Sequence, residues 1–301
     1  MDFETEDFVE GDAILSVPPV NQTEFFVSYP QIDSPTFTPN PQAYRVQERS
    51  FTPTSSNGFN YYRDVFIRNS TNFNINVQDF LTQPIPITLQ NGKPQVLIIH
   101  THGTEAFFPN ELNPYEPSDG KRSHDYNVNI IRVGDELARV LSAHGFDVKH
   151  DRTIYDWPSF SGSYSRALKS IESYLERYPN IEIVIDIHRD SITTDVGTIY
   201  SAVFEYKNEN YAQMMFVAGS NGGGLYFPHW RDTLVFTTHM QQAMIDRAPD
   251  SMRPILLRDG RFNLHAAPGS LLLEVGSSGN CLDEAIRSVR LFGDVMAEVL
   301  G

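Results

Sequence analysis

The chain has 301 residues, and its 38 Asp and Glu outnumber 23 Lys and Arg, which gives a formal net charge of −15. With 40% hydrophobic and 20% charged residues, the composition is typical of a globular protein with one large domain or two small ones. Such an acidic surface repels nucleic-acid phosphates and anionic lipid head groups, which excludes nucleic acid as a partner. The one cysteine, Cys281, cannot form an internal disulfide.

The first third of the chain is irregular. Residues 1–60 are rich in Pro, Ser, Thr, Asn and Gln and lack a helical period, which predicts an extended, partly ordered lead segment. Residues 61–93 contain short β-type runs at 64–67 and 74–77, which predict a small β annex. We find neither an apolar run long enough to span a bilayer nor a basic start typical of a signal peptide. Contact with a membrane is therefore expected only through an anchor absent from this chain.

Apolar runs and amphipathic patterns alternate over residues 94–301. Short, wholly apolar runs are typical of strands buried on both faces of a parallel sheet, and apolar residues at helical spacing predict helices packed on it. The predicted strands cover 96–99, 146–148, 183–185, 214–218 and 271–273, and the predicted helices cover 128–144, 163–177, 231–247 and 282–300. The alternation predicts an α/β fold, a three-layer sandwich with a mostly parallel central sheet.

Polar residues that can bind metal follow three of the predicted strands, where open α/β sheets place their ligands. After the first strand, His102 and Glu105 read H-x-x-E, a spacing at which a short turn brings an imidazole and a carboxylate onto one zinc ion. After a second strand, His188 stands between Asp186 and Asp190, and either carboxylate can accept its other ring N–H. The alternative at each segment is a set of capping or ion-paired side chains that only hold a loop.

Three further residues have candidate roles in the reaction. Glu274 leaves a buried strand, which is costly for a carboxylate unless it is salt-bridged or works as the general base that activates water. Arg189 can pair with a carboxylate or stabilise a developing oxyanion. His124, just before a predicted helix, can reach the metal as an alternative ligand. We assign no role to His100, and His150 is expected on the surface or in a loop.

These segments resemble the stage II sporulation protein P family in order and spacing over roughly residues 94–301. The resemblance rests on HTHGTEAF (100–107), NIIRVGDELARVL (129–141), HDRTIYDWPSFSGSYSRA (150–167), DIHRD (186–190), GGGLYFPHWRDTL (222–234) and LLLEVGSSGN (271–280). Residues 1–60 carry no resemblance. Together these motifs are specific enough to identify the chain as a member of the family.

The resemblance implies a fold like that of the zinc N-acetylmuramoyl-L-alanine amidases, with one Zn²⁺. It implies hydrolysis of the amide between N-acetylmuramic acid and the L-alanine of peptidoglycan, and a second, endopeptidase activity on the crosslinks. It also implies an extracytoplasmic place at the sporulation septum during engulfment, a membrane anchor, and stage II sporulation proteins D and M as partners. Carried onto this chain, His102 and His188 are metal ligands and Glu274 is the catalytic carboxylate.

The chain departs from the wider zinc amidase pattern at one ligand. That pattern takes a Glu from just before the helix that begins here near Asn127, where this chain has Ser123-His124-Asp125. We therefore assign the carboxylate ligand to Glu105, as in zinc carboxypeptidases, with His124 as the alternative. Two other functions stay open: a zinc carboxypeptidase or endopeptidase acting on stem peptides, which needs an arginine to clamp a C-terminal carboxylate, and a catalytically silent wall-binding scaffold.

Overall fold

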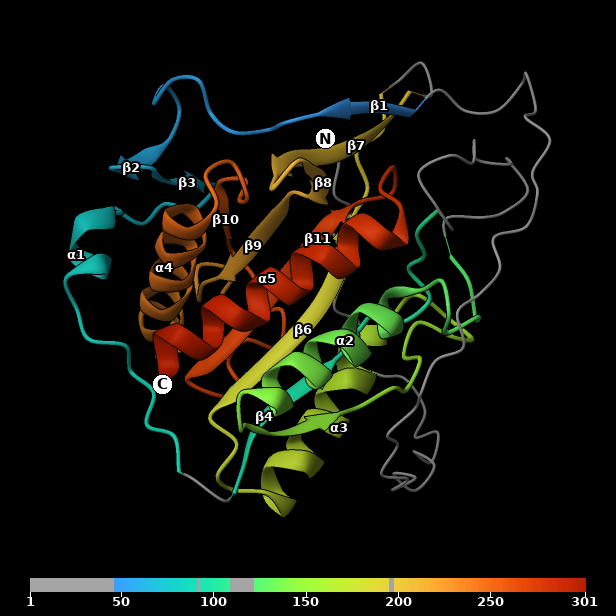
Figure 1. Cartoon of the computed structure of the whole chain (residues 1–301). Helices are drawn as coiled ribbons and strands as arrows, with labels where there is room; N and C mark the ends of the chain where they lie inside the picture. The colour runs from blue at the N-terminus through green and yellow to red at the C-terminus, as the bar shows by residue number, and fades with distance from the viewer. Residues whose placement is uncertain (1–45, 91–92, 109–121, 195–197) are drawn as a thin grey trace.

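A computed structural model of the chain describes residues 46–90, 93–108, 122–194 and 198–301 (Figure 1). Most of the predicted lead segment, residues 1–45, therefore lies outside the described residues. Within the described part, no helix combines the length and the apolar character needed to cross a bilayer.

The central element is an eight-stranded mixed sheet (Figure 1). Five of its seven neighbouring pairs are parallel, and only β2–β3 and β9–β11 are antiparallel. This confirms the predicted α/β fold with a mostly parallel sheet. In spatial order the strands are β2 (Asn60–Tyr62), β3 (Val65–Asn69), β10 (Ile255–Arg258), β9 (Met214–Gly219), β11 (Gly269–Ser277), β6 (Ile183–Asp190), β4 (Pro94–Ile99) and β5 (Asp147–His150).

Helices cover both faces of this sheet, so the fold has three layers (Figure 1). Alternate residues of β4 face opposite sides: Val96 and Ile98 join one apolar core, and Leu97 and Ile99 join another. The first and larger core is formed with α2 (Ile130–Ala143), α4 (Trp230–Arg247) and α5 (Leu282–Leu300). The second is closed by α3 (Ser163–Arg177). All four helices begin and end within two residues of the predicted bounds.

The N-terminal part of the described chain joins this body. β2 and β3 extend the central sheet at one edge, where β3 pairs with β10. The strand predicted at 74–77 is wrong, because Val77–Leu81 forms the short helix α1. Asn76 caps it by accepting the Gln78 N–H at 3.3 Å, an interaction typical of a helix start. α1 then packs against α4.

A second, three-stranded sheet lies beside the first and was not predicted. It consists of β1 (Val46–Arg49), β7 (Ile199–Tyr206) and β8 (Glu209–Ala212), with β7 in the middle. Strands β7 and β8 form a hairpin whose turn residues, Lys207 and Asn208, both have positive φ. Lysine is not a residue that signals such a turn, so the sequence gives little indication of this hairpin.

One buried carboxylate joins two helices of the larger layer. Glu136 of α2 accepts hydrogen bonds from Arg139 on the same helix, at 2.7 Å, and from Arg290 of α5, at 2.6 Å. Burial opposes its charge, but the two guanidinium groups lower the pKa of Glu136 to about 2. The ionised carboxylate therefore stabilises the α2–α5 contact.

We expect Glu136→Gln to lower the free energy of unfolding at pH 7 by about 2 kcal/mol, a value discounted because both arginines are half-exposed. Since the folded pKa lies below the ordinary 4.5, this stability is complete above that value and is lost as the pH falls toward 2. Urea unfolding from pH 7 to pH 3 should show the gap between wild type and variant shrinking. Glu298→Gln, which breaks an exposed pair with Arg247, is the control and should change the stability little at any pH. A stability difference between wild type and Glu136→Gln that does not depend on pH would contradict the role of the ionised Glu136.

Candidate active site

The three segments singled out by the sequence end side by side. β4 pairs with β6 and β6 pairs with β11, both in parallel, so the same edge of the sheet carries their carboxyl ends. In the β6–β11 register, Glu274 is directly opposite His188. His102 and Glu105 lie in the turn that follows β4. All four side chains are buried.

His188 lies between two carboxylates. Its Nε2 is 2.9 Å from Oδ1 of Asp186, and its Nδ1 is 3.7 Å from Oε2 of Glu105. Asp186 is fixed in turn by Thr101, whose backbone N–H and hydroxyl donate to it at 2.8 and 2.6 Å. The sequence left Asp186 and Asp190 open as the partner of this ring, and Asp186 is the carboxylate that lies next to its Nε2. Nδ1 is left as the nitrogen that faces Glu105.

His102 is placed by contacts on two sides. Its Nδ1 is 3.4 Å from the hydroxyl of Ser163, the first residue of α3. Phe160 stacks on the ring with a centroid separation of 4.3 Å. The His102 and His188 rings are 5.2 Å apart and nearly perpendicular. Nε2 is therefore the His102 nitrogen suited to bind a metal.

Glu105 is held from the backbone. The N–H of Arg189 donates to its Oε2 at 2.9 Å, and its own carbonyl accepts the N–H of Ile130 at 2.7 Å, at the start of α2. The Arg189 side chain donates to the carbonyls of Ala106, at 2.8 Å, and Asp190, at 3.3 Å. Arg189 thus ties the turn after β4 to the end of β6.

Burial and neighbouring charges shift the pKa of each of these groups. Burial lowers the pKa of His102 and raises that of Glu105. For His188 burial acts downward, but Asp186, Glu105 and Glu274 together raise its pKa to about 10. The carboxylates around His188 thus favour a positive charge at this point, which either a proton on the ring or a bound metal ion can supply.

Glu274 differs from its neighbours in having an unused oxygen. Its Oε2 is buried and has no hydrogen-bond partner among the described residues. Burial, with smaller contributions from Asp190 and Glu105, raises the pKa of Glu274 to about 8 against the opposing charges of His188 and Arg253. A buried carboxylate with an unpartnered oxygen and a pKa near neutrality is suited to accept a proton.

The donor types match those that zinc takes in proteins. Two imidazoles and one carboxylate form a zinc set, and the 3.7 Å between His188 Nδ1 and Glu105 Oε2 is close to the roughly 3.4 Å that separates two ligands of a tetrahedral ion. Asp186 and Ser163 supply the outer contacts that orient the two rings. Within the described ranges, no three His, Cys, Asp or Glu side chains yet surround a single point closely enough to form a metal cage. The donors fit zinc, and binding would draw them together.

The alternative ligand, His124, is placed less favourably. It is exposed, and its ring packs edge-on against Trp157, itself 62% exposed, at 4.9 Å. The geometry therefore favours Glu105 over His124.

The sequence does not predict the pairing of His100 with His150, next to the turn that follows β4. His100 donates or accepts at 2.8 Å with His150, and its other nitrogen is 3.1 Å from the carbonyl of Ile187. His150 is not a surface or loop residue as expected: it ends β5, and its side chain is 10% exposed against Asp135. The alternation of β4 could have predicted the burial of His100. Val96 and Ile98 face α2, and His100 is the next residue on that side of the strand. Gly134 of α2 makes room, since a Cβ there would collide with the His100 ring.

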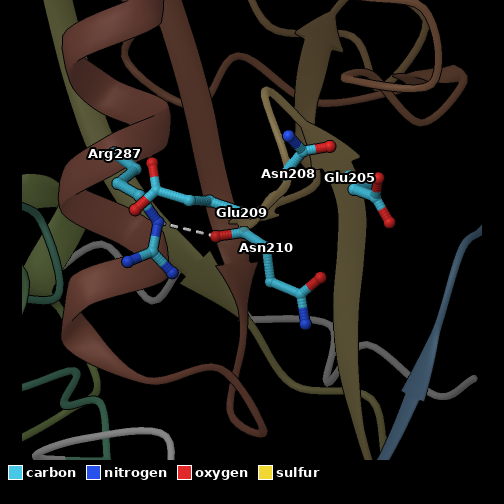
Figure 2. A pocket seen from close by; sticks show the side chains of 5 residues that line it. All are labelled: Glu205, Asn208, Glu209, Asn210 and Arg287. Carbon is cyan, nitrogen blue, oxygen red and sulfur yellow. Dashed lines mark hydrogen bonds between the residues drawn. The ribbon is translucent and has the colours of Figure 1, made fainter.

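A surface pocket lies apart from these residues. It measures about 360 Å³ and lies between the β7–β8 hairpin and α5 (Figure 2). Arg287 of α5 donates to the carbonyl of Asn210 at 2.7 Å across it. It contains none of the predicted site residues, so we do not place the reaction there. Its lining residues are Glu205, Asn208, Glu209, Asn210 and Arg287.

The sequence model of the stage II sporulation protein P family matches residues 36–297. The chain belongs to the stage II sporulation protein P family. It is 24% identical over 225 residues to the stage II sporulation protein P of Bacillus subtilis (strain 168), covering 71% of this chain and 53% of that protein. The chain thus spans about half the length of this curated family member.

Among solved structures, the fold is similar to those of two N-acetylmuramoyl-L-alanine amidases. That of Clostridium difficile 630 is 13% identical with a TM-score of 0.42, covering 70% of this chain and 96% of that one. AmiC2 of Nostoc punctiforme is 15% identical with a TM-score of 0.38, covering 70% of this chain and 97% of that one.

A buried ion pair next to Glu274 gives a test of how the site is held. Arg253 donates to Asp190 at 2.6 Å, and both side chains are at most 4% exposed. Arg253→Met should lower the free energy of unfolding by about 3–5 kcal/mol, because it leaves a carboxylate buried without its cation. The double variant Arg253→Met/Asp190→Leu should recover most of the loss in urea unfolding. A double variant as unstable as the single one would show that packing, and not the unpaired charge, causes the loss.

Proposed function

We propose that this member of the stage II sporulation protein P family is a zinc-dependent hydrolase that cleaves the amide between N-acetylmuramic acid and L-alanine in peptidoglycan. One observation carries the proposal: two imidazoles and a carboxylate meet at adjoining strand ends beside Glu274, a buried carboxylate with an unpartnered oxygen. This arrangement supports the assignment of a set of metal ligands and a proton acceptor to one site. A metal that activates water and a carboxylate that moves its proton are together sufficient to hydrolyse an amide.

The proposed ligands are His102, Glu105 and His188, which leave a fourth position for the reaction. When bound, zinc supplies a Lewis acid that polarises the amide carbonyl and lowers the pKa of water. Asp186, 2.9 Å from Nε2 of His188, would favour a proton on that nitrogen, which leaves Nδ1 as the nitrogen available to a metal. Arg189 fixes the Glu105 carboxylate through its backbone N–H, which is the role that its contacts support.

Glu274 moves the proton. As water attacks the amide carbon, one of its protons passes to the Glu274 carboxylate and a C–O bond forms. Glu274 then delivers that proton to the nitrogen of L-alanine as the C–N bond breaks, which yields a free amine and a carboxylic acid that loses its remaining proton to solvent. The raised pKa of Glu274 suits both steps, because a group that ionises near neutrality can accept and then return a proton.

The wider setting is proposed from family membership. From that membership we infer a peptidoglycan substrate outside the cytoplasm at the sporulation septum, retention by a membrane anchor, and stage II sporulation proteins D and M as partners. Cleavage of peptide crosslinks is proposed as a second activity of the same site.

The test is mass spectrometry of what the purified protein releases from isolated peptidoglycan, with and without a zinc chelator. We expect free stem peptides that begin with L-alanine, lost on chelation and restored by zinc. Single amino acids or cut crosslinks alone would instead identify a carboxypeptidase or endopeptidase. No release from the zinc-loaded protein would contradict the enzyme assignment and favour the scaffold.

A matched pair of variants tests the proton path. Glu274→Gln should reduce kcat by at least about a hundredfold while zinc content stays near one per chain, because it removes the proton acceptor and none of the ligands. Glu298→Gln removes the same charge from the exposed face of α5 and should leave kcat unchanged. Full activity of Glu274→Gln would contradict the role of Glu274.

A further inference from the structure

Arg122 is the site arginine that solvent can reach. Its side chain is 42% exposed, whereas Arg189 and Arg253 are 5% and 4% exposed and bonded to their neighbours. Its sequence context predicts no role for it. Its position beside the proposed ligands and its exposure make it accessible to a ligand that arrives from solvent.

The backbone fixes Arg122 next to the metal-binding turn. Arg122 and Glu105 form an antiparallel bridge, and the N–H of Ser123 donates to the carbonyl of Thr104 at 2.6 Å. The position of Arg122 relative to the proposed ligands is therefore set by main-chain contacts. Its charge reaches both His102 and Glu105: it adds to the lowering of the His102 pKa, and it opposes part of the rise that burial causes in the pKa of Glu105.

Side-chain contacts orient the guanidinium. Arg122 donates to Asp156 at 2.6 Å and to the hydroxyl of Thr104 at 3.2 Å. Asp156 also accepts hydrogen bonds from the backbone and hydroxyl of Thr104, and its side chain is only 1% exposed. An anion that arrives from solvent thus meets the guanidinium and not the carboxylate that holds it.

Phe160 links this guanidinium to the proposed centre. The Arg122 guanidinium lies over its ring at 4.5 Å, and the same ring stacks on His102 at 4.3 Å. The two groups are thus one aromatic ring apart. At about 3.5 Å per residue, a substrate group bound by Arg122 belongs to a residue close to the scissile amide.

We propose that Arg122 forms a carboxylate subsite that selects substrates carrying a free carboxylate near the scissile bond. A planar guanidinium has five N–H donors, and Asp156 and Thr104 use one nitrogen, so an edge is left for a carboxylate to bind in bidentate fashion. The carboxylate can be a branch of the stem peptide or its C-terminus. The inference rests on the proposed function and names the chemical group that the same site recognises.

The experiment measures binding by calorimetry to zinc-loaded Glu274→Gln, which holds substrate without turning it over. The probes are N-acetylmuramoyl-L-alanyl peptides with D-isoglutamate or D-isoglutamine in the second position, each with a C-terminal acid or amide. We expect one acid to bind at least about tenfold more tightly than its amide, as for a hydrogen bond to a charged group. Whichever position shows the preference identifies the source of the carboxylate.

Adding Arg122→Gln should bring that acid-to-amide ratio close to one, and Arg122→Lys should keep part of it, because the charge remains without the fork. Arg177→Gln, at the far end of α3, is the matched control and should keep the full ratio. If Arg122 has only a structural role, its replacement weakens the binding of acid and amide equally and leaves their ratio unchanged, which would overturn the inference.

Equal binding of acid and amide by the parent protein would also overturn the inference, but it would not contradict the proposed function. Failure of every peptide to bind would contradict the proposed function and the inference together.

Discussion

The candidate site depends on the parallel alignment of β4, β6 and β11. In this alignment β6, which carries His188 near its end, lies between β4 and β11. The register of β6 with β11 sets Glu274 opposite His188. Ionisable groups so deeply buried are costly unless each charge has a partner. Here the partners are within the cluster: Asp186 for His188, and Arg253 for Asp190. Among the described residues, the buried Oε2 of Glu274 has no hydrogen-bond partner in this pairing.

The turn after β4 connects this cluster to the rest of the fold. Its backbone pairs with the segment that leads into α2, through Glu105 and Arg122, and with the first turn of α2 at Ile130. From the other side, the loop before α3 contributes Asp156 and Phe160. Both helix layers therefore fix the position of the turn, and the proposed metal ligands and the carboxylate subsite share this support.

The sequence predicts the parts of this structure whose signals are local. Strands buried on both faces are short apolar runs, so β4, β6, β9 and β11 were identified, and amphipathic periods gave the four long helices. Strand β10 is not predicted, since it pairs with strands distant in the chain. The β7–β8 hairpin is not predicted either, because Lys207-Asn208 is not a typical turn sequence. At the candidate site, the sequence predicts His102, Glu105, His188 and Glu274 because they follow apolar runs, and the structure brings them together. Arg122 and Arg253 were missed, because only the folded chain brings them to Asp156 and Asp190.

The central claim is that His102, Glu105 and His188 hold one zinc ion beside Glu274. Anomalous diffraction at the zinc absorption edge, from crystals of the zinc-loaded protein, tests it most directly. The account predicts a single strong peak about 2.0–2.2 Å from one nitrogen of each histidine and from a Glu105 oxygen, with Glu274 outside bonding distance. A peak bound by other residues, by His124 in place of Glu105, or no peak at this edge of the sheet would contradict it.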